Sequence, residues 1–213
     1  MESAAALLPD DRSTTPDARI RVQTARIEDK PRIGEILTAA FADDPPARWL
    51  YPDERDFCRD FPDFVRAFGG DSVELGAAYC VEGAHACALW LPPGSEADEA
   101  ALVDHVVWRI ATSRHDEVFE VFEALGRAHP TEPHWYLPLI GVDPAYQGRG
   151  LGSALLRLAL ERCDREGMPA YLEATCEDNV RLYERHGFRR LSPVRVGSCP
   201  TITPMWRAGS DRR

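Results

Sequence analysis

A short glycine-rich segment, Gln147-Gly148-Arg149-Gly150-Leu151-Gly152, carries the clearest chemical signal in this chain. It follows an apolar, strand-like run at Tyr136–Val142 and precedes an amphipathic segment at 153–165 with leucines at helical spacing. The first amides of a helix point forward without partners inside the helix, and the helix dipole adds positive potential there. Glycine lets a ligand approach this backbone closely. The segment therefore predicts an anion site that suits a pyrophosphate.

Two common phosphate-binding motifs fit this segment poorly. A P-loop requires Gly-Lys followed by Ser or Thr, whereas Gly152 is followed directly by Ser153. A dinucleotide fingerprint requires G-x-G-x-x-G tight against the strand and an acidic residue about twenty residues further on. Glu173 lies at about that distance, but the glycine spacing differs and Pro144–Gln147 intervene. A glycine turn that only starts a helix is the remaining alternative, and three alternating glycines argue against it.

The segment does fit the pattern Q/R-x-x-G-x-G/A through Gln147, Gly150 and Gly152. A second strand-like run follows at 169–175, and Asn-x-x-x-Tyr-x-x-x-Gly-Phe then spans 179–188. With these motifs the chain resembles the GCN5-related N-acetyltransferases (the GNAT superfamily), over roughly residues 19–207. Within the superfamily, its stretches at 40–45 and 134–137 look most similar to puromycin N-acetyltransferase-like enzymes.

The resemblance implies an α/β GNAT fold: a mixed, mostly antiparallel central sheet with a splayed parallel strand pair at the acetyl-CoA site, flanked by helices. It also implies acetyl-CoA as co-substrate. The residues implied to bind it come from the first parallel strand, the glycine-rich loop and the short helix, and they are Ile140, Gly141, Val142, Gln147, Gly148, Arg149, Gly150, Leu151, Gly152, Ser153, Asn179 and Tyr183. A backbone amide near Val142 would stabilise the thioester oxygen. Cys176 departs from the family, since many relatives carry asparagine there.

Tyr183 matches the general acid of the family, which protonates the departing thiolate. It follows Asn179 by four residues and therefore lies on the same helical face. An ammonium acceptor must also lose a proton, and Glu173 is our first choice for the base, because a partly apolar cleft makes a carboxylate a stronger proton acceptor. Tyr136 and His134 are lesser choices. For the histidines at 85, 105, 115, 129 and 186 we expect surface or helix-end positions.

The acceptor pocket of this fold is lined by the segment after the first helix. Asp43, Asp44, Trp49 and Tyr51 offer carboxylates and aromatic faces for a cationic amine, and we add Tyr136 to the substrate-binding set. Each of these residues has an ordinary alternative, as a loop cap or a core side chain. We expect the acceptor to be a small-molecule primary amine, antibiotic-like or metabolic. Acetylation of a protein N-terminus or lysine, and a non-catalytic acyl-CoA-binding domain, are the alternatives.

Apolar periodicity predicts the elements that position these residues. The expected strands span 19–26, 73–81, 84–91, 136–142, 169–175, 187–196 and 201–206. The expected helices span 28–41, 53–68, 96–128, 153–166 and 179–186, with the third broken near Ser113. Asp43-Asp44-Pro45-Pro46 should end the first helix, and Arg48–Pro52 should form a loop.

Composition narrows the class of protein. The chain has 213 residues, 44% of them hydrophobic and 28% charged, and a net charge of −10. An acidic chain without basic stripes argues against nucleic acid as a partner and favours a cationic substrate. No apolar run approaches the length of a membrane span, so no membrane partner is expected.

The length suits one domain at 19–207 between an N-terminal tail at 1–18 and a C-terminal tail at 208–213. The first residues lack the basic start and apolar core of a signal peptide. The six cysteines include no C-x-x-C pair, so neither a metal site nor a disulfide framework is expected, and reduced thiols suit the cytoplasm. Monomer and homodimer both remain open.

Overall fold

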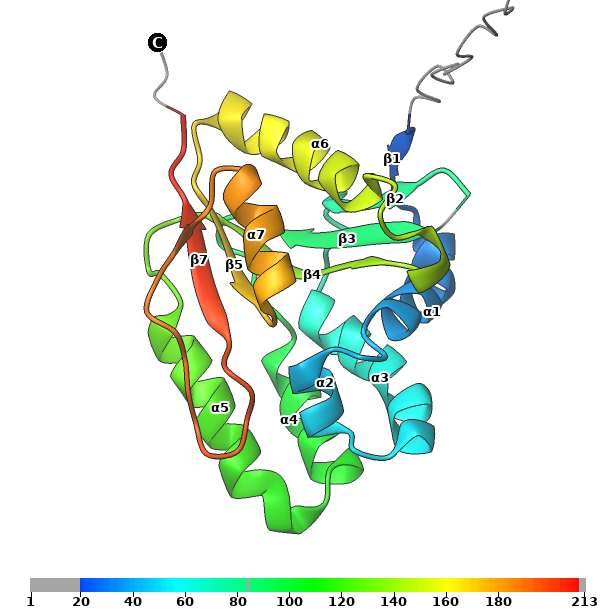
Figure 1. Ribbon diagram of the computed structural model, residues 1–213, viewed down its shortest axis with the longest axis vertical. Helices are drawn as coiled ribbons and strands as arrows, with labels where there is room; N and C mark the ends of the chain where they lie inside the picture. The colour runs from blue at the N-terminus through cyan, green and yellow to red at the C-terminus, as the bar shows by residue number, and fades with distance from the viewer. Residues whose placement is uncertain (1–19, 84, 211–213) are drawn as a thin grey trace, which may run out of the picture.

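The computed structural model describes residues 20–83 and 85–210, which form a seven-stranded sheet flanked by helices (Figure 1). The strand order is β1-β2-β3-β4-β5-β7-β6. The strands are β1 Val22–Thr24, β2 Ala78–Val81, β3 Ala86–Leu91, β4 Trp135–Val142, β5 Ala170–Ala174, β6 Arg189–Arg190 and β7 Thr203–Arg207. β4 and β5 run parallel, and the other neighbouring pairs are antiparallel. The predicted mixed, mostly antiparallel α/β architecture is confirmed.

Helices cover both faces of this sheet. They are α1 Lys30–Ala40, α2 Pro45–Leu50, α3 Glu54–Gly69, α4 Glu99–Arg109, α5 His115–Ala128, α6 Leu151–Glu166 and α7 Glu177–Arg185. One buried core lies between the sheet and α6 with α7, and a second lies between the sheet and α1 to α5. The chain thus builds a separate apolar layer on each side of the sheet.

Aspartate side chains begin three of the helices on the second face. Asp44 accepts from the amide of Ala47 at 3.1 Å, and Asp53 accepts from the amides of Arg55 and Asp56. Asp98 accepts from Ala101 at 3.0 Å. Each such cap stabilises a helix by about 1 kcal/mol relative to alanine. These caps fix where α2, α3 and α4 begin on this face of the sheet.

One predicted loop is wrong, because α2 occupies most of it. Arg48–Pro52 was expected to be irregular, yet the helix runs from Pro45 to Leu50. Proline tolerates the first helical turn, where its missing N–H has no partner to lose. Asp43–Pro46 does end α1, as expected, but the same residues also start a new helix.

Three predicted strands are much shorter than expected, and the one predicted at 19–26 spans only Val22–Thr24. β2 begins only at Ala78, because hydrogen-bonded turns occupy 71–76 and Gly76 has a φ of +61°. The strand expected at 187–196 is paired at Arg189–Arg190, with one further bridge between Val194 and Ile202. The expected break near Ser113 is confirmed, since α4 ends at Arg109 and α5 begins at His115.

The tail predicted at 1–18 lies outside the described residues, as does 211–213 of the predicted C-terminal tail. Within 20–83 and 85–210, no helix is long and apolar enough to cross a membrane. The same ranges contain no group of three or more His, Cys, Asp or Glu side chains placed to hold a metal ion.

Candidate active site

A bulge in β4 shapes the centre of the site. Leu139 pairs with Leu89 on β3, whereas Tyr136 pairs with Leu91, so β4 carries one extra residue between these pairs. The bulge changes which face a side chain takes. Leu137 packs in the core under α6, but Leu139 packs in the core under α1 and α3, although alternate residues of a regular strand share a face.

Beyond the bulge, β4 and β5 separate. Their pairing runs through 135–137 of β4 and 170–172 of β5. The amide of Asp143 donates to the carbonyl of His85, on the β3 side, at 2.9 Å. Because amides alternate along an antiparallel strand, those of Val142 and Ile140 point the other way, toward the gap. The gap therefore offers two backbone donors to an extended ligand.

The glycine-rich loop connects this strand end to α6. Gln147 donates its side-chain amide to the carbonyl of Val142 at 3.2 Å, which braces the loop against β4. Gly148 and Gly150 have φ values of +73° and +79°, a region that favours glycine. A Cβ atom added at Gly148 would meet nothing within 4 Å, so the space before the loop is open. The first amides of the long helix α6 face this space.

A cavity of about 470 Å³ joins the loop, the end of β4 and α7. Eleven of the predicted cofactor residues line it, namely Ile140, Gly141, Val142, Gln147, Gly148, Gly150, Leu151, Gly152, Ser153, Asn179 and Tyr183. Ala40, Phe41 and Asp44 line it from the opposite face of the sheet. The open cradle, forward-facing amides and strand gap fit a phosphorylated, extended ligand such as acetyl-CoA.

Arg149 is the predicted cofactor residue that does not line this cavity. Its guanidinium lies 5.0 Å from the centre of the Tyr146 ring and donates to the carbonyl of Ala145 at 3.1 Å. Arg185 lines the cavity instead, from the end of α7. Sequence reasoning missed Arg185, although its position two residues after Tyr183 places it near the same helix end.

Tyr183 is buried, and its side chain lines the cavity. Burial raises the pKa of its hydroxyl well above the ordinary tyrosine value, and Cys176 and Asp44 add to the shift. The hydroxyl therefore holds its proton at neutral pH and can act as a donor. The Gly-Phe pair of the motif supports this position, because the amide of Phe188 donates to the carbonyl of Tyr183 at 3.1 Å.

A second, smaller cavity of about 110 Å³ lies on the α1–α5 side. Six aromatic side chains line it: Phe41, Trp49, Phe61, Phe64, Phe68 and Phe122. Its carboxylates are Asp44 and Glu173, and Phe41 and Asp44 line the larger cavity as well. The two cavities therefore meet at Phe41 and Asp44.

Asp44 is held at this junction by two hydrogen bonds. Thr175, just after β5, donates its hydroxyl to one carboxylate oxygen of Asp44, and the amide of Ala47 donates to the other. Asn179 approaches Thr175 from α7 at 3.4 Å. Burial raises the pKa of Asp44, although its hydrogen bonds to Thr175 and Ala47 oppose the shift. Sequence reasoning chose Asp44 but missed Thr175.

Glu173 lies beside a pair of histidines. His129 Nδ1 is 3.8 Å from Glu173 Oε1, and His129 Nε2 is 3.0 Å from His134 Nε2. His134 Nδ1 lies 2.6 Å from the carbonyl of Glu132, which only accepts, so His134 carries its proton on Nδ1. Burial lowers the pKa of His134 and keeps it neutral. His134 thus accepts from His129, and a proton on His129 Nδ1 would face Glu173.

Burial and the charge of Glu173 raise the pKa values of Tyr136 and Tyr171. Tyr136 is buried beside His129, with ring centres 4.8 Å apart, and it does not line either cavity. Trp49 lines the smaller cavity, but Arg114 lies 4.7 Å from the centre of its ring. One face of Trp49 is therefore already covered by a cation.

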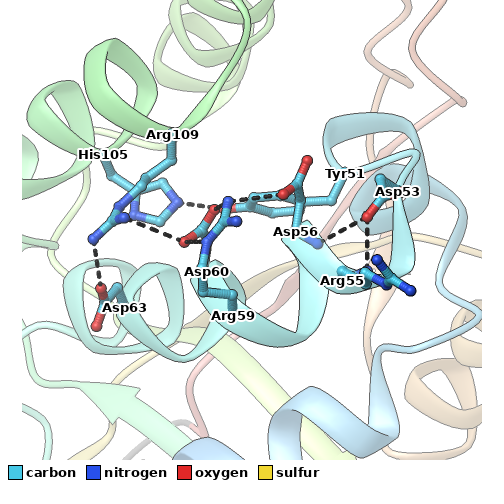
Figure 2. Close-up of polar contacts among 9 residues, drawn as sticks. All are labelled: Tyr51, Asp53, Arg55, Asp56, Arg59, Asp60, Asp63, His105 and Arg109. Carbon is cyan, nitrogen blue, oxygen red and sulfur yellow. Dashed lines mark hydrogen bonds and ion pairs between the residues drawn. The ribbon is translucent and has the colours of Figure 1, made fainter.

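Tyr51 and Asp43 lie away from both cavities. Tyr51 is buried and contacts His105 of α4 through its hydroxyl, in a polar cluster between α3 and α4 (Figure 2). His105, expected at the surface or a helix end, is buried there. Asp60 anchors this cluster, and its paired hydrogen bonds from Arg59 lower its pKa. Asp43 is exposed to solvent. The cluster holds α4 on α3 rather than forming part of the acceptor pocket.

Residues 98–188 match the sequence model of the acetyltransferase (GNAT) family. An uncharacterized N-acetyltransferase of Schizosaccharomyces pombe is 26% identical over 175 residues, which are 76% of this chain and 71% of that protein. The N-alpha-acetyltransferase RimI of Mycobacterium tuberculosis is 44% identical over 69 residues, 32% of this chain and 41% of the relative.

A Corynebacterium glutamicum structure, described as histone acetyltransferase HPA2 and related acetyltransferase, superposes with a TM-score of 0.64 at 25% identity. The match covers 91% of this chain and 98% of that one. Fold, site and comparisons define an acyl-group transferase. Residues 98–188 of this chain thus carry an acetyltransferase domain of the GNAT family, whose members generally use acetyl-CoA as co-substrate. The closer likeness to puromycin N-acetyltransferase-like enzymes stays a prediction.

Proposed function

We propose that this protein transfers the acetyl group of acetyl-CoA to the primary amine of a small molecule, by direct attack in a ternary complex. The observation that carries the proposal is the meeting of two cavities at Phe41 and Asp44. One cavity has a cradle for a pyrophosphate and a protonated tyrosine, and the other has an apolar chamber with carboxylates. A donor and an acceptor bound in these cavities would meet at the junction.

The larger cavity would hold acetyl-CoA along β4. The pyrophosphate would bind the amides of the loop from Gly148 to Gly152, with Arg185 as a nearby cation. The pantetheine arm would then run into the strand gap, against the amides of Val142 and Ile140. The amide nearer the junction is that of Ile140, and it would stabilise the charge that develops on the thioester oxygen.

The reaction needs a proton acceptor for the ammonium and a proton donor for the departing sulfur, and Glu173 and Tyr183 would fill these two roles. The acceptor ammonium would give one proton to Glu173, and the free amine would form a C–N bond to the acetyl carbon. The C–S bond breaks, and the sulfur leaves with the electron pair and takes the proton of Tyr183. The proton that nitrogen loses as the amide forms would restore Tyr183, while His129 offers Glu173 a route for its proton to solvent. The net products are an amide, a thiol and one proton.

The small size and the aromatic lining of the smaller cavity favour a small molecule over a protein acceptor. Its lining includes Val118 and Phe122 of α5 and Ile202 of the segment before β7. Figure 1 shows that segment descending beside α5. A peptide would need an open groove here. The similarity to RimI favours N-terminal acetylation as the second candidate, but it covers 41% of that protein.

The test is mass spectrometry of amines incubated with the full-length protein and acetyl-CoA. We expect an acetyl gain on small primary amines, and we expect Tyr183→Phe to lower kcat by about 10²–10⁴-fold while the Kd for acetyl-CoA is kept. Tyr79→Phe is the matched control, because its hydroxyl contacts Arg162 outside both cavities. Full activity in Tyr183→Phe would show that Tyr183 is not the general acid. Acetylation of peptide N-termini alone would support the second candidate.

A further inference from the structure

The smaller cavity is narrow and almost entirely apolar. At about 110 Å³ it is smaller than the apolar cavity of about 150 Å³ that holds one benzene ring in an engineered protein. Three phenylalanines of α3 form one wall, at positions 61, 64 and 68, and their neighbouring rings lie 5.6 and 5.3 Å apart. Phe122 and Leu125 of α5 lie on another side. These walls leave room for a body no larger than one ring.

The polar groups of the cavity gather along the end of β5. Glu173 and Thr175 both line the cavity, and as alternate residues of an extended segment they share a face. Thr175 holds Asp44, so two carboxylates bracket this edge of an otherwise apolar chamber. The side chain of Glu173 is 10% exposed. A ligand that binds here would direct one cationic group toward this edge and its apolar body toward the phenylalanines.

We propose that the acceptor is a compact apolar primary amine, whose body is a single ring or an alkyl group of similar size. This inference rests on the proposed function and adds the substrate class. The ammonium group binds between Asp44 and Glu173, next to the cavity for acetyl-CoA. The ring packs against Phe64, Phe68 and Phe122.

The same lining rejects polar amines. A hydroxyl placed among the phenylalanine rings would lose its water without gaining a hydrogen bond, which costs binding free energy. A second ammonium group, as in a polyamine, would lie among apolar side chains far from either carboxylate. Amines with two fused rings are larger than the cavity, and the packed side chains of its wall cannot move far enough to admit them.

The test compares initial rates with five amines at saturating acetyl-CoA, by thiol release and product mass. The amines are cyclohexylamine, 4-aminocyclohexanol, tryptamine, spermidine and a peptide with N-terminal alanine. We expect the highest kcat/KM for cyclohexylamine, at least about tenfold above 4-aminocyclohexanol, which adds only one hydroxyl to the same ring. Tryptamine and spermidine should be poorer by at least a similar factor.

Two variants test whether the ring wall sets this preference. Phe122→Ala enlarges the cavity and should raise the kcat/KM ratio of tryptamine to cyclohexylamine at least about tenfold. Phe64→Leu is the milder second variant and should shift the ratio in the same direction. Trp108→Ala is the control, because Trp108 is 80% exposed on α4 and outside the cavity. Thermal melting and acetyl-CoA binding verify that each variant is folded.

The outcomes separate the inference from the function on which it rests. Faster acetylation of spermidine, 4-aminocyclohexanol or the peptide would overturn the substrate class and leave acetyl transfer standing. An unchanged tryptamine ratio in both folded wall variants would also overturn it. Binding of acetyl-CoA without acetylation of any amine would contradict the proposed function, and the inference would fall with it.

Discussion

The two cavities are lined by different kinds of chemical groups. The larger one presents main-chain amides, from the separated end of β4 and from the glycine-rich loop, over a few turns of chain between 140 and 153. The smaller one presents side chains from α2, α3 and α5, from β4 and β5, and from Phe41, Asp44, Cys199 and Ile202 in the connecting segments. A pocket made of backbone is fixed by local conformation, whereas a pocket made of side chains depends on how distant elements pack. The first suits a constant co-substrate, and the second can vary with the acceptor.

The largest effect should come from the backbone side. Gly150→Glu places a carboxylate and a Cβ at a residue that lines the larger cavity and has a φ of +79°. Repulsion from the pyrophosphate and strain in the loop should weaken acetyl-CoA binding about 10³-fold or more, measured by titration calorimetry. Gly126→Glu is the matched control, since it adds the same charge at an exposed position of α5 with no neighbour within 4 Å. Equal affinity in both variants would move the anion site away from this loop.

The next effect should come from the acceptor side. Glu173→Gln keeps the shape of the side chain but removes the proton acceptor, so kcat/KM for the amine should fall about 10²-fold at neutral pH. The loss should shrink as the pH approaches the pKa of the amine, where less acceptor needs deprotonation. Affinity for acetyl-CoA should not change. Glu123→Gln, on the exposed face of α5, serves as control, and a wild-type rate in Glu173→Gln would assign deprotonation to another group.

A smaller effect should appear where the two cavities meet. Asp44→Asn retains the capping oxygen of α2 but loses the charge that attracts the ammonium, so the KM for the amine should rise about tenfold. The pKa of Asp44 is raised by burial, and the charged form is the one that binds. As the pH falls through this pKa, Asp44 takes up a proton and the rate should decline. Because the pKa is raised, this decline should begin at a higher pH than it would for an exposed aspartate with a pKa of about 3.9.

The pH profile of kcat/KM, recorded at saturating acetyl-CoA, provides the measurement for this third variant. In Asp44→Asn, the decrease of kcat/KM at acidic pH that is caused by protonation of Asp44 should be absent. A profile identical to wild type would show that Asp44 caps α2 without contacting the acceptor. Asp44 would then no longer link the acetyl-CoA cavity to the acceptor cavity functionally.

The contrast between backbone and side chains also explains what the sequence could reveal. Gly148 and Gly150 need their residue type for local reasons, so their pattern indicated the loop and the helix that follows. Tyr183 and Asn179 were readable because their spacing is that of one short helix. The fold class came from the family resemblance that these motifs carry. These features depend on neighbours that are close in the chain.

The acceptor side depended on contacts that no local pattern encodes. Tyr51 offered an aromatic face, but its hydroxyl contacts His105 across a helix pair. Trp49 offered another, but Arg114 lies over its ring. Thr175 gained its place through a contact with Asp44, 131 positions away. The helix α2 was missed because a proline pair can either end one helix or start the next.

A crystal structure of the protein with bound CoA tests the central claim most directly. We predict the pyrophosphate within hydrogen-bond distance of the amides between Gly148 and Gly152, and the pantetheine in the gap between β4 and β5, against Val142 and Ile140. The thiol should end beside Asp44 and Tyr183. CoA bound outside this gap, or a thiol that ends away from the cavity lined by Phe64 and Phe122, would contradict the account.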